Sequence, residues 1–376
     1  MIAVVAAILC ALALCNACKD KGGASTTPGA KAGSAQLPPD QAYSAPTPSQ
    51  SGAPRQLILF YTGDTLSIPE ANKDYHPHQG GLPALVNAIT SAQSQILRYN
   101  QLRVQNEGGD AGMVRADYER GLIGDNPYML LDYGLWERPK DAAGGLYVEL
   151  YFNMYKLIHY TAVCSALYDS LAAERWQQYI TIAPKGFRLL NTAGTARGTT
   201  LPTVPIITRE LYGEKWGVVA VPTAGAAEEA LEQSAQQLQE KMQAYIEQAA
   251  AVLQKNRCTR SILLASGAPR TFYQQLAQDK RFTVVIGAHP AVAAAVGYHE
   301  MPTGGALLLP ALNGGGRELG VCHLCFTPAG DKPFVYSLER VICTDDGSPT
   351  YPFRKQVAAA VLAHKTQSSS PKGATP

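Results

Sequence analysis

The sequence lacks any long run of lysine or arginine, and it contains no internal repeat. Its 32 basic and 30 acidic residues give a formal net charge of only +2. Chains that bind nucleic acid usually carry a basic patch or tail, so this charge balance argues against a nucleic acid partner. Apolar residues are plentiful, at 46% of the 376 residues, which is enough for the core of one large domain or two ordinary ones.

The apolar run at the amino terminus, residues 1–18, is also short. It is too short to span a bilayer comfortably, and it is typical of the hydrophobic region of a secretory signal peptide. Cys18 follows Ala17, which resembles a bacterial lipoprotein cleavage site. We therefore expect lipidation of Cys18, which would anchor the mature chain in the bacterial cell envelope, facing the periplasm. The alternatives are an uncleaved membrane anchor and secretion.

Large apolar side chains are nearly absent from residues 19–55, which are rich in Gly, Ala, Ser, Thr and Pro. Such a segment buries too little surface to offset its ordering entropy, so we predict a disordered linker of roughly 30–35 Å r.m.s. length. Residues 366–376 predict a second disordered tail. The folded domain is therefore predicted to cover residues 56–365.

Segments typical of strands and of helices alternate within this domain, which favours an α/β fold. The predicted strands cover residues 57–62, 128–132, 161–164, 204–211, 216–221, 260–266, 282–287, 307–310, 320–327 and 334–343. The predicted helices follow Gly80-Gly81, lie between 266 and 282, and cover residues 147–159, 166–179, 226–255 and 353–364. The late run of strands indicates a second, mixed sheet.

Short motifs follow the predicted strands in a fixed order. The first strand runs into Gly63-Asp64, and later motifs read LLDYGLWE (130–137), TAVCSALYD (161–169), ILLASGAP (262–269) and IGAHPA (286–291). The strand pair at 205–222 and the segment GGALLLPALNGGGRELG (304–320) continue the order. Over residues 56–345 these motifs resemble the N-terminal catalytic domain of calcineurin-like metallophosphoesterases of the 5'-nucleotidase / UDP-sugar hydrolase family.

This resemblance implies an α/β fold, a four-layer αββα sandwich of the metallo-dependent phosphatase type. It also implies two cations about 3.5–4 Å apart that clamp a phosphate and activate a water. Asp64 and His289 match two metal ligands of the family. Other ligand positions carry different residues, namely Leu66, Leu135, Ser165, Ala166, Gly267 and Ala291. Two remnants are too few for two hard cations, so we expect no cofactor; divalent metal ions are expected only if activity is retained.

His76 and His78 are candidate substitute ligands, because residues two apart lie on one side of an extended segment. Loop histidines beside proline and glutamine are more often simply solvated. A rebuilt single-metal site and a solvated loop therefore remain alternatives.

Eight cysteines are present, of which Cys10, Cys15 and Cys18 lie in the leader. Cys164 is predicted to end a strand and to stand at the start of the next helix, where backbone N–H groups favour a thiolate. We therefore predict a reactive thiol with a lowered pKa; the alternative is a small buried side chain. The chain also resembles a branch of the family in which some members contain selenocysteine.

Cys322 and Cys325 form a C-x-x-C pattern inside a predicted strand. Residues three apart in a strand point to opposite faces, so without a bulge the two sulfurs are not expected to meet. A zinc site that adds His323 and Cys343 is not supported by the spacing.

Three hypotheses follow for function. The first is a non-catalytic binding or scaffold lipoprotein that reuses the phosphoesterase cleft. The second is a thiol-dependent redox protein centred on Cys164. The third is a residual metal-dependent hydrolase of phosphoesters such as nucleotides. The expected partners are a membrane, through the lipid anchor, and an unidentified small molecule or protein.

Overall fold

The structure is a computed structural model, in which residues Pro54–Pro376 form one compact unit. The residues that it describes are 55–63, 70, 78–106, 127–134, 150, 154, 158, 160–164, 189–192, 203–221, 235–265, 268–296, 305–326, 334–345, 355–359 and 361–362. The predicted signal peptide with Cys18, the predicted linker up to residue 54 and the predicted tail lie outside these ranges. No helix in the described ranges is long and apolar enough to cross a membrane.

The first sheet has five strands in the order β13-β12-β1-β3-β4. Their bounds are β1 (Arg55–Thr62), β3 (Tyr128–Asp132), β4 (Ala162–Val163), β12 (Glu318–Phe326) and β13 (Phe334–Ile342). β1, β3 and β4 run parallel, whereas β12 is antiparallel to β1 and to β13. A bridge between Cys164 and Leu190 adds β5 (Leu189–Leu190), which pairs with β6 (Thr203–Val204).

The second sheet has the order β11-β10-β9-β8-β7. Its strands are β7 (Ile207–Leu211), β8 (Glu214–Ala220), β9 (Arg260–Leu264), β10 (Val284–Ala288) and β11 (Leu307–Pro310). β8 to β11 run parallel, and β7 pairs antiparallel with β8 across the turn at Tyr212-Gly213. Every residue of β9, β10 and β11 is buried, as expected for parallel strands that are covered on both faces.

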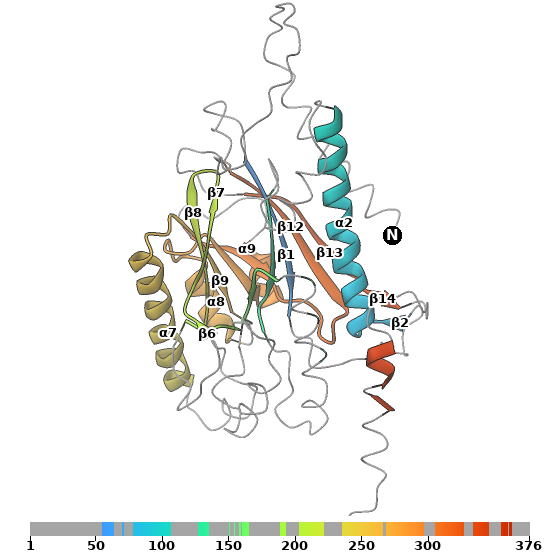
Figure 1. Cartoon of the computed structure of the whole chain (residues 1–376). Coiled ribbons are helices and arrows are strands. Elements are labelled where there is room, and N and C mark those ends of the chain that lie inside the picture. Colours follow the sequence, from blue (N-terminus) through green and yellow to red (C-terminus); the bar gives the residue numbers. More distant parts are fainter. Residues whose placement is uncertain are drawn as a thin grey trace, which may run out of the picture. The chain divides into compact units, whose positions relative to one another are not determined.

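Helices cover the outer faces of the two sheets (Figure 1). α2 (Leu82–Asn106) packs on the first sheet, and it begins directly after Gly80-Gly81, as that pair predicts. The second sheet is covered by α7 (Ala235–Lys255), α8 (Arg270–Leu276) and α9 (Pro290–Val296). Each sheet therefore has one helical face and one face toward the other sheet.

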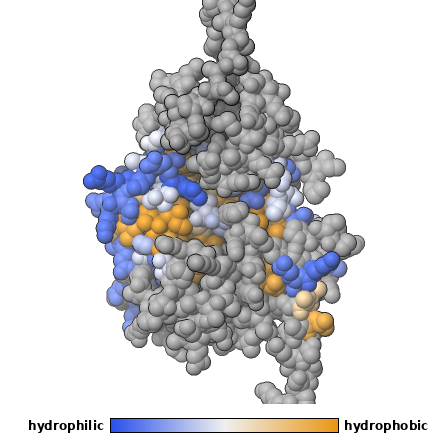
Figure 2. All heavy atoms as spheres, viewed as in Figure 1, coloured by the Kyte–Doolittle hydropathy of each residue, from blue (hydrophilic) through white to orange (hydrophobic). Residues whose placement is uncertain are grey.

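α7 is amphipathic, as predicted from its sequence. Its apolar residues face the second sheet and are buried; they include Met242, Ile246, Ala249 and Leu253. Those of its glutamate and glutamine side chains that the structure describes are exposed, and α7 lies at the hydrophilic left edge of the surface in Figure 2. The described part of the helix begins at Ala235.

Alternation along each strand divides the core into layers. Phe60 faces α2, whereas its neighbour Leu59 faces the second sheet. In the second sheet, Leu264 faces the first sheet and Leu263 faces the helices. The order helix, sheet, sheet, helix is an αββα sandwich, so the predicted fold class is confirmed.

The parallel strands of both sheets end at one common edge, which we term the carboxyl edge. Directly after β3, the hydroxyl of Tyr133 accepts a hydrogen bond of 2.8 Å from the backbone N–H of Leu312, which follows β11. After β5, Thr192 pairs with Ala220 at the end of β8, through N–H···O of 3.2 Å and a bond of 2.9 Å from Ala220 N to Thr192 Oγ1. These two links join the sheets where their parallel strands end.

Some short elements differ from prediction. The strand predicted over residues 204–211 is divided at Pro205 into β6 and β7, because proline has no N–H to give to a ladder. α9 was not predicted, nor was the small sheet of β2 (His78–Gln79) and β14 (Thr344–Asp345). Most of the helix predicted over 147–159 and all of that over 166–179 lie outside the described residues.

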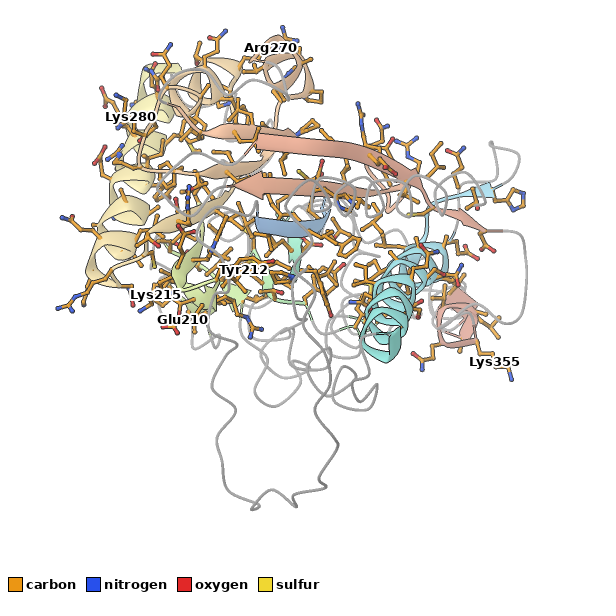
Figure 3. The ribbon with its side chains drawn as sticks, turned by 90° about the horizontal axis from the view of Figure 1, so that it is seen from above. Glu210, Tyr212, Lys215, Arg270, Lys280 and Lys355 are labelled. Carbon is orange, nitrogen blue, oxygen red and sulfur yellow. The ribbon has the colours of Figure 1, made fainter. Side chains whose placement is uncertain are left out.

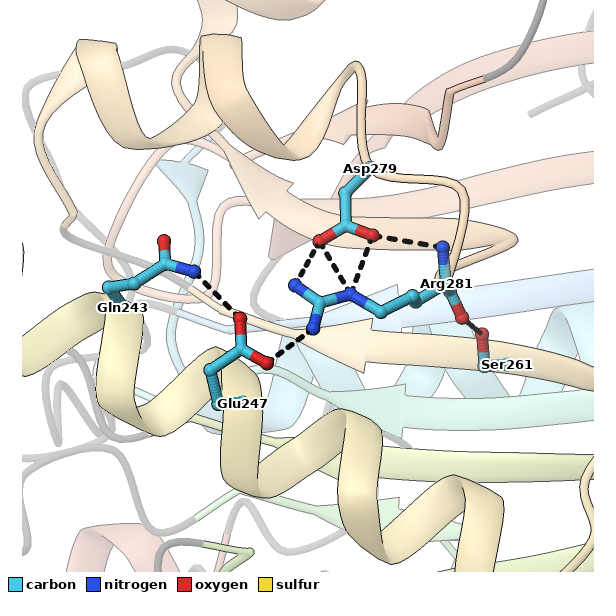
Figure 4. A network of polar contacts seen from close by, with 5 residues as sticks. All are labelled: Gln243, Glu247, Ser261, Asp279 and Arg281. Atoms are coloured by element: carbon cyan, nitrogen blue, oxygen red, sulfur yellow. Dashed lines mark hydrogen bonds and ion pairs between the residues drawn. The ribbon is translucent and has the colours of Figure 1, made fainter.

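A polar network ties α7 to the loop that follows α8 (Figure 4). The guanidinium of Arg281 donates 2.6 Å to Glu247 on α7 and 2.8 Å to Asp279. Gln243 also donates to Glu247, and Ser261 Oγ donates to the backbone carbonyl of Arg281. Because the network is exposed, we expect it to orient α7 relative to this loop and to contribute little to the free energy of folding.

Substitution of Gly320 tests how tightly the two sheets pack. A Cβ atom at Gly320 would overlap the ring of Tyr61, which is fully buried between the sheets. We expect Gly320→Ala to lower the free energy of unfolding by about 1–3 kcal/mol in a urea titration. The double variant Gly320→Ala/Tyr61→Leu should recover part of that loss relative to the sum of the single changes. Strictly additive losses would contradict the packing.

His323 makes stability depend on pH. It is 4% exposed, its Nε2 has no hydrogen-bond partner among the described residues, and burial lowers its pKa from 6.5 to about 4. Between pH 6.5 and about pH 4, His323 is therefore protonated in the unfolded chain and neutral in the folded chain. The free energy of unfolding should fall by about 3 kcal/mol from pH 7 to pH 4 through this group.

The matched variant is His323→Leu, which has no titrating ring. Urea titrations at several pH values give the free energy of unfolding of both proteins. Between about pH 4 and pH 6.5 this free energy should fall more steeply with falling pH in the unchanged protein than in the variant. Equal slopes for both would contradict the burial of a neutral imidazole.

Candidate functional site

The candidate site lies at the carboxyl edge, where ligands of open parallel sheets usually bind. From the first sheet, the residues that follow the strands are Gly63, Tyr133, Cys164 and Asn191. From the second sheet they are Val221, Ala265, His289 and Ala311. Cys164 and His289 therefore lie at the same edge, on opposite sheets. Asp64, Leu135 and His76 lie outside the described residues.

Tyr133 fills the space between the two sheets at this edge. Its side chain is fully buried, and a Cβ atom at Gly63 would overlap its ring. Its hydroxyl reaches the second sheet, where Leu312 N donates to it at 2.8 Å. Gly134, at φ 95°, then turns the chain away. Sequence reasoning missed Tyr133, although a bulky aromatic directly before a glycine at a strand end is a visible signal.

Asp132 is a second residue that sequence reasoning missed. It is fully buried, and its carboxylate accepts hydrogen bonds from Thr62 Oγ1 at 2.8 Å and from Gly134 N at 2.7 Å. The hydroxyls of Thr62 and Tyr160 are 2.9 Å apart. The protein's own donors thus hold this carboxylate. The signal in the sequence was an aspartate at the end of an otherwise apolar strand.

The prediction of a lowered pKa for Cys164 is wrong. The residue is 1% exposed and faces the core between the sheets. Burial raises the pKa of its thiol, and the negative charge of Asp132 raises it further. The predicted helix whose first turn would stabilise a thiolate lies outside the described residues. What the structure places here is a neutral, buried sulfhydryl.

The other described cysteines are also free thiols, namely Cys258, Cys322 and Cys343. Burial raises the pKa of Cys343, as it raises that of the half-buried Cys258. Cys322 faces the core between the sheets, and the β12–β13 register shifts between His323 and Leu324. The side chain of Cys325 lies outside the described residues.

His289 lies directly before α9 and contacts a cation rather than carboxylates. Its Nδ1 lies 3.2 Å from the backbone N–H of Ala291, and its Nε2 lies 3.2 Å from Nε of Arg270. A neutral imidazole accepts at one nitrogen only, so these two donors compete for it. Whichever donor the imidazole accepts, the guanidinium of Arg270 lies beside Nε2, the nitrogen that a metal would need.

Tyr273 holds the loops that carry Arg270 and His289. Its hydroxyl lies 3.0 Å from the carbonyl oxygen of Gly287 and 3.2 Å from that of Ala265, at the ends of β10 and β9. The side chain is buried, and burial raises the pKa of its hydroxyl. Because Tyr273 lies one turn after Arg270 on α8, it sets the position of that helix relative to both strands.

Asn191 has a buried side-chain amide. It is 4% exposed, and neither its Nδ2 nor its Oδ1 has a hydrogen-bond partner among the described residues. Its backbone N–H is used, since it donates to Val204 O at 2.9 Å. An unsatisfied buried amide is costly, so it commonly marks a place where water or a ligand binds.

The described residues do not fit a two-metal centre. No group of three or more His, Cys, Asp and Glu side chains is placed to hold a metal ion within the described ranges. His78 is exposed and lies in β2, opposite Asp345 of β14. At His289 the neighbouring charge is the guanidinium of Arg270, which would repel a cation.

A sandwich of this topology, with its site at the carboxyl edge, defines the metallophosphoesterase fold. NAD nucleotidase (NadN) of Haemophilus influenzae has a similar structure at 10% identity and a TM-score of 0.51, over 83% of this chain and 63% of that one. The 5'-nucleotidase precursor of Thermus thermophilus matches at 14% identity and a TM-score of 0.48, over 83% and 59%.

The calcineurin-like phosphoesterase YfkN of Bacillus subtilis matches at 14% identity and a TM-score of 0.46, over 84% of this chain and 98% of that one. No family model matches the sequence, and no curated protein matches it. The chain has the 5'-nucleotidase-like metallophosphoesterase fold, as predicted, and it spans less than two thirds of the length of the nucleotidases that it matches.

Timed alkylation tests the assignment of the thiols. We expect iodoacetamide to label Cys258 first among the four described free cysteines, because it is half-buried and the other three are buried. Cys164 should react only after denaturation. Peptide mapping by mass spectrometry reports the order, with Cys258→Ser as the control. Fast labelling of Cys164 in the folded protein would restore the redox hypothesis.

Proposed function

We propose that this chain is a non-catalytic binding module with the metallophosphoesterase fold, displayed on the cell envelope as a lipoprotein. It keeps the sandwich and the carboxyl edge of a 5'-nucleotidase-like hydrolase and uses that edge to bind rather than to hydrolyse. The position of Tyr133 carries this proposal. Its ring occupies the gap between Gly63 and Leu312, and the carboxylate of its neighbour Asp132 accepts hydrogen bonds from Thr62 and Gly134.

The charges near His289 support the same proposal of a non-catalytic role. Hydrolysis by two metals needs several anionic or neutral ligands that converge on the cations. At His289 the nearest charge is instead the positive guanidinium of Arg270, 3.2 Å from Nε2. By the family resemblance, Leu135 replaces a bridging aspartate and so removes negative charge, and Leu66 replaces a histidine ligand. The edge therefore favours an anion over a cation.

The thiol hypothesis has less support. A redox thiol needs thiolate character and access to solvent. Cys164 has a raised pKa and is buried, so it lacks both in the folded protein.

The proposed location rests on the leader sequence. Cys18 after Ala17 supports lipidation, and residues 19–54 would then separate the folded unit from the membrane. In this arrangement the module acts at the surface of the envelope membrane, facing the periplasm.

Metal content and hydrolysis test the proposal together. We expect no stoichiometric Mn, Zn or Fe in the purified protein, and negligible release of phosphate from AMP when Mn²⁺ is added. The reason is that the described edge offers no convergent set of ligands. Native mass spectrometry and a phosphate assay give the readouts, with an active 5'-nucleotidase assayed in parallel. Two metal ions per chain together with turnover would refute a non-catalytic role.

A further inference from the structure

We propose that β13 (Phe334–Ile342) is an acid-sensitive edge of the first sheet: in mild acid, protonation of His323 releases β13 from β12, while the second sheet stays folded. Three features support this device. They are the burial of an imidazole without a partner, its position next to the terminal strand, and an irregularity in the ladder that joins β12 to β13. The device would act independently of whatever the carboxyl edge binds.

The imidazole of His323 is enclosed on the helical side of the first sheet. In the register of the strands, His323 lies opposite Ile58 of β1 and Ser337 of β13. Opposite residues of an antiparallel pair point to the same face, and Ile58 belongs to the core on the α2 side. His323 is 4% exposed, and its Nε2 has no hydrogen-bond partner among the described residues. A charged imidazole in this position would be far costlier than a neutral one.

The elements that flank and cover His323 offer little charge to balance a proton. On β1, the residues that face the same side are Ile58 and Phe60, and both are apolar. The part of α2 whose side chains are described, residues 82–96, contains no charged residue. Lys355, nearer the carboxyl terminus, is exposed, and Figure 3 shows it pointing away from the strands.

Glu339 of β13 is the acidic group that shares the face of His323. It lies opposite Val321, one step along the strand pair, so its Cβ atom is roughly 7–8 Å from that of His323. Burial raises the pKa of Glu339, so this carboxylate takes up a proton at a higher pH than a solvated glutamate does. It therefore stabilises a protonated His323 less as the solution becomes more acidic.

β13 is the element whose displacement uncovers His323 most easily. It is the last strand in the order β13-β12-β1-β3-β4, so within that sheet it pairs with β12 alone. The β12–β13 register shifts between His323 and Leu324, whereas the β1–β12 register is continuous from Arg55 to Tyr61. A register shift disrupts the ladder locally, and segments with few protected hydrogen bonds open at low free energy. Opening is therefore expected on the β13 side of His323.

Acid shifts the balance toward the open form. Burial lowers the pKa of His323 to about 4 in the closed form, whereas the solvated imidazole of the open form has the usual value of 6.5. Opening therefore takes up a proton, and it becomes more favourable as the pH falls below 6.5. Through this group, the ratio of open to closed molecules should rise about twentyfold from pH 7 to pH 5.

Amide hydrogen exchange followed by mass spectrometry, on the purified full chain at pH 7, pH 6 and pH 5, tests this device. Dividing each rate by the intrinsic rate at the same pH gives a protection factor for each peptide. We expect the protection factors of peptides from β13 to fall about twentyfold from pH 7 to pH 5. Those of β9, in the centre of the second sheet, should change little. This pH range lies above the usual pKa values of carboxyl groups.

His323→Leu and His323→Gln are the test variants, because neither new side chain titrates. In both variants β13 should be as protected at pH 5 as at pH 7. His78→Gln is the matched control, since His78 is an exposed histidine. Its removal should leave the fall in the protection of β13 unchanged.

Each contrary result identifies the part of the proposal that is wrong. An equal fall in the protection of β9 and β13 would indicate unfolding of the whole domain and would overturn a local edge. A selective fall in β13 that persists in both His323 variants would overturn the role of His323. Constant protection of β13 from pH 7 to pH 5 would overturn the release of the strand.

Discussion

The face-to-face packing of the two sheets is the constraint on which the rest of the structure depends. Side chains from Leu57, Leu59, Tyr61 and Leu131 in the first sheet meet Val218, Ile262, Leu264 and Ile286 in the second, and all are buried. Apolar contact of this kind has no direction of its own, so the polar links at Tyr133 and Thr192 fix how the sheets align. That alignment brings the ends of all the parallel strands to one edge.

Once the edge is formed, its chemistry depends on a few side chains. A hydrolase of this fold places cations there and surrounds them with carboxylates, amides and imidazoles. In this chain, Tyr133 closes part of the gap, and Arg270 lies beside the imidazole of His289. An arginine carries its charge permanently, so the guanidinium of Arg270 opposes a cation beside His289.

Much of the fold was predictable from the sequence because long apolar strands and the helix after Gly80-Gly81 have strong periodic signals. The strands at 128–132 and 307–310 match prediction to the residue. The site was less predictable, since it depends on contacts between distant segments. Tyr133 meets a residue 179 positions away, which no local pattern reveals. The prediction for Cys164 was wrong for a related reason. Its exposure was inferred from the lost metals, whereas the packed sheets bury it. The roles of Asp64 and His76 stay predictions.

The central claim is that protein side chains, rather than cations, occupy the carboxyl edge. Anomalous diffraction from crystals grown with Mn²⁺ tests this claim most directly, because it locates the metal regardless of any activity. The account predicts no anomalous peak within bonding distance of His289, with the guanidinium of Arg270 still hydrogen-bonded to the imidazole. A peak bound to Nε2 of His289, with Arg270 displaced, would contradict it.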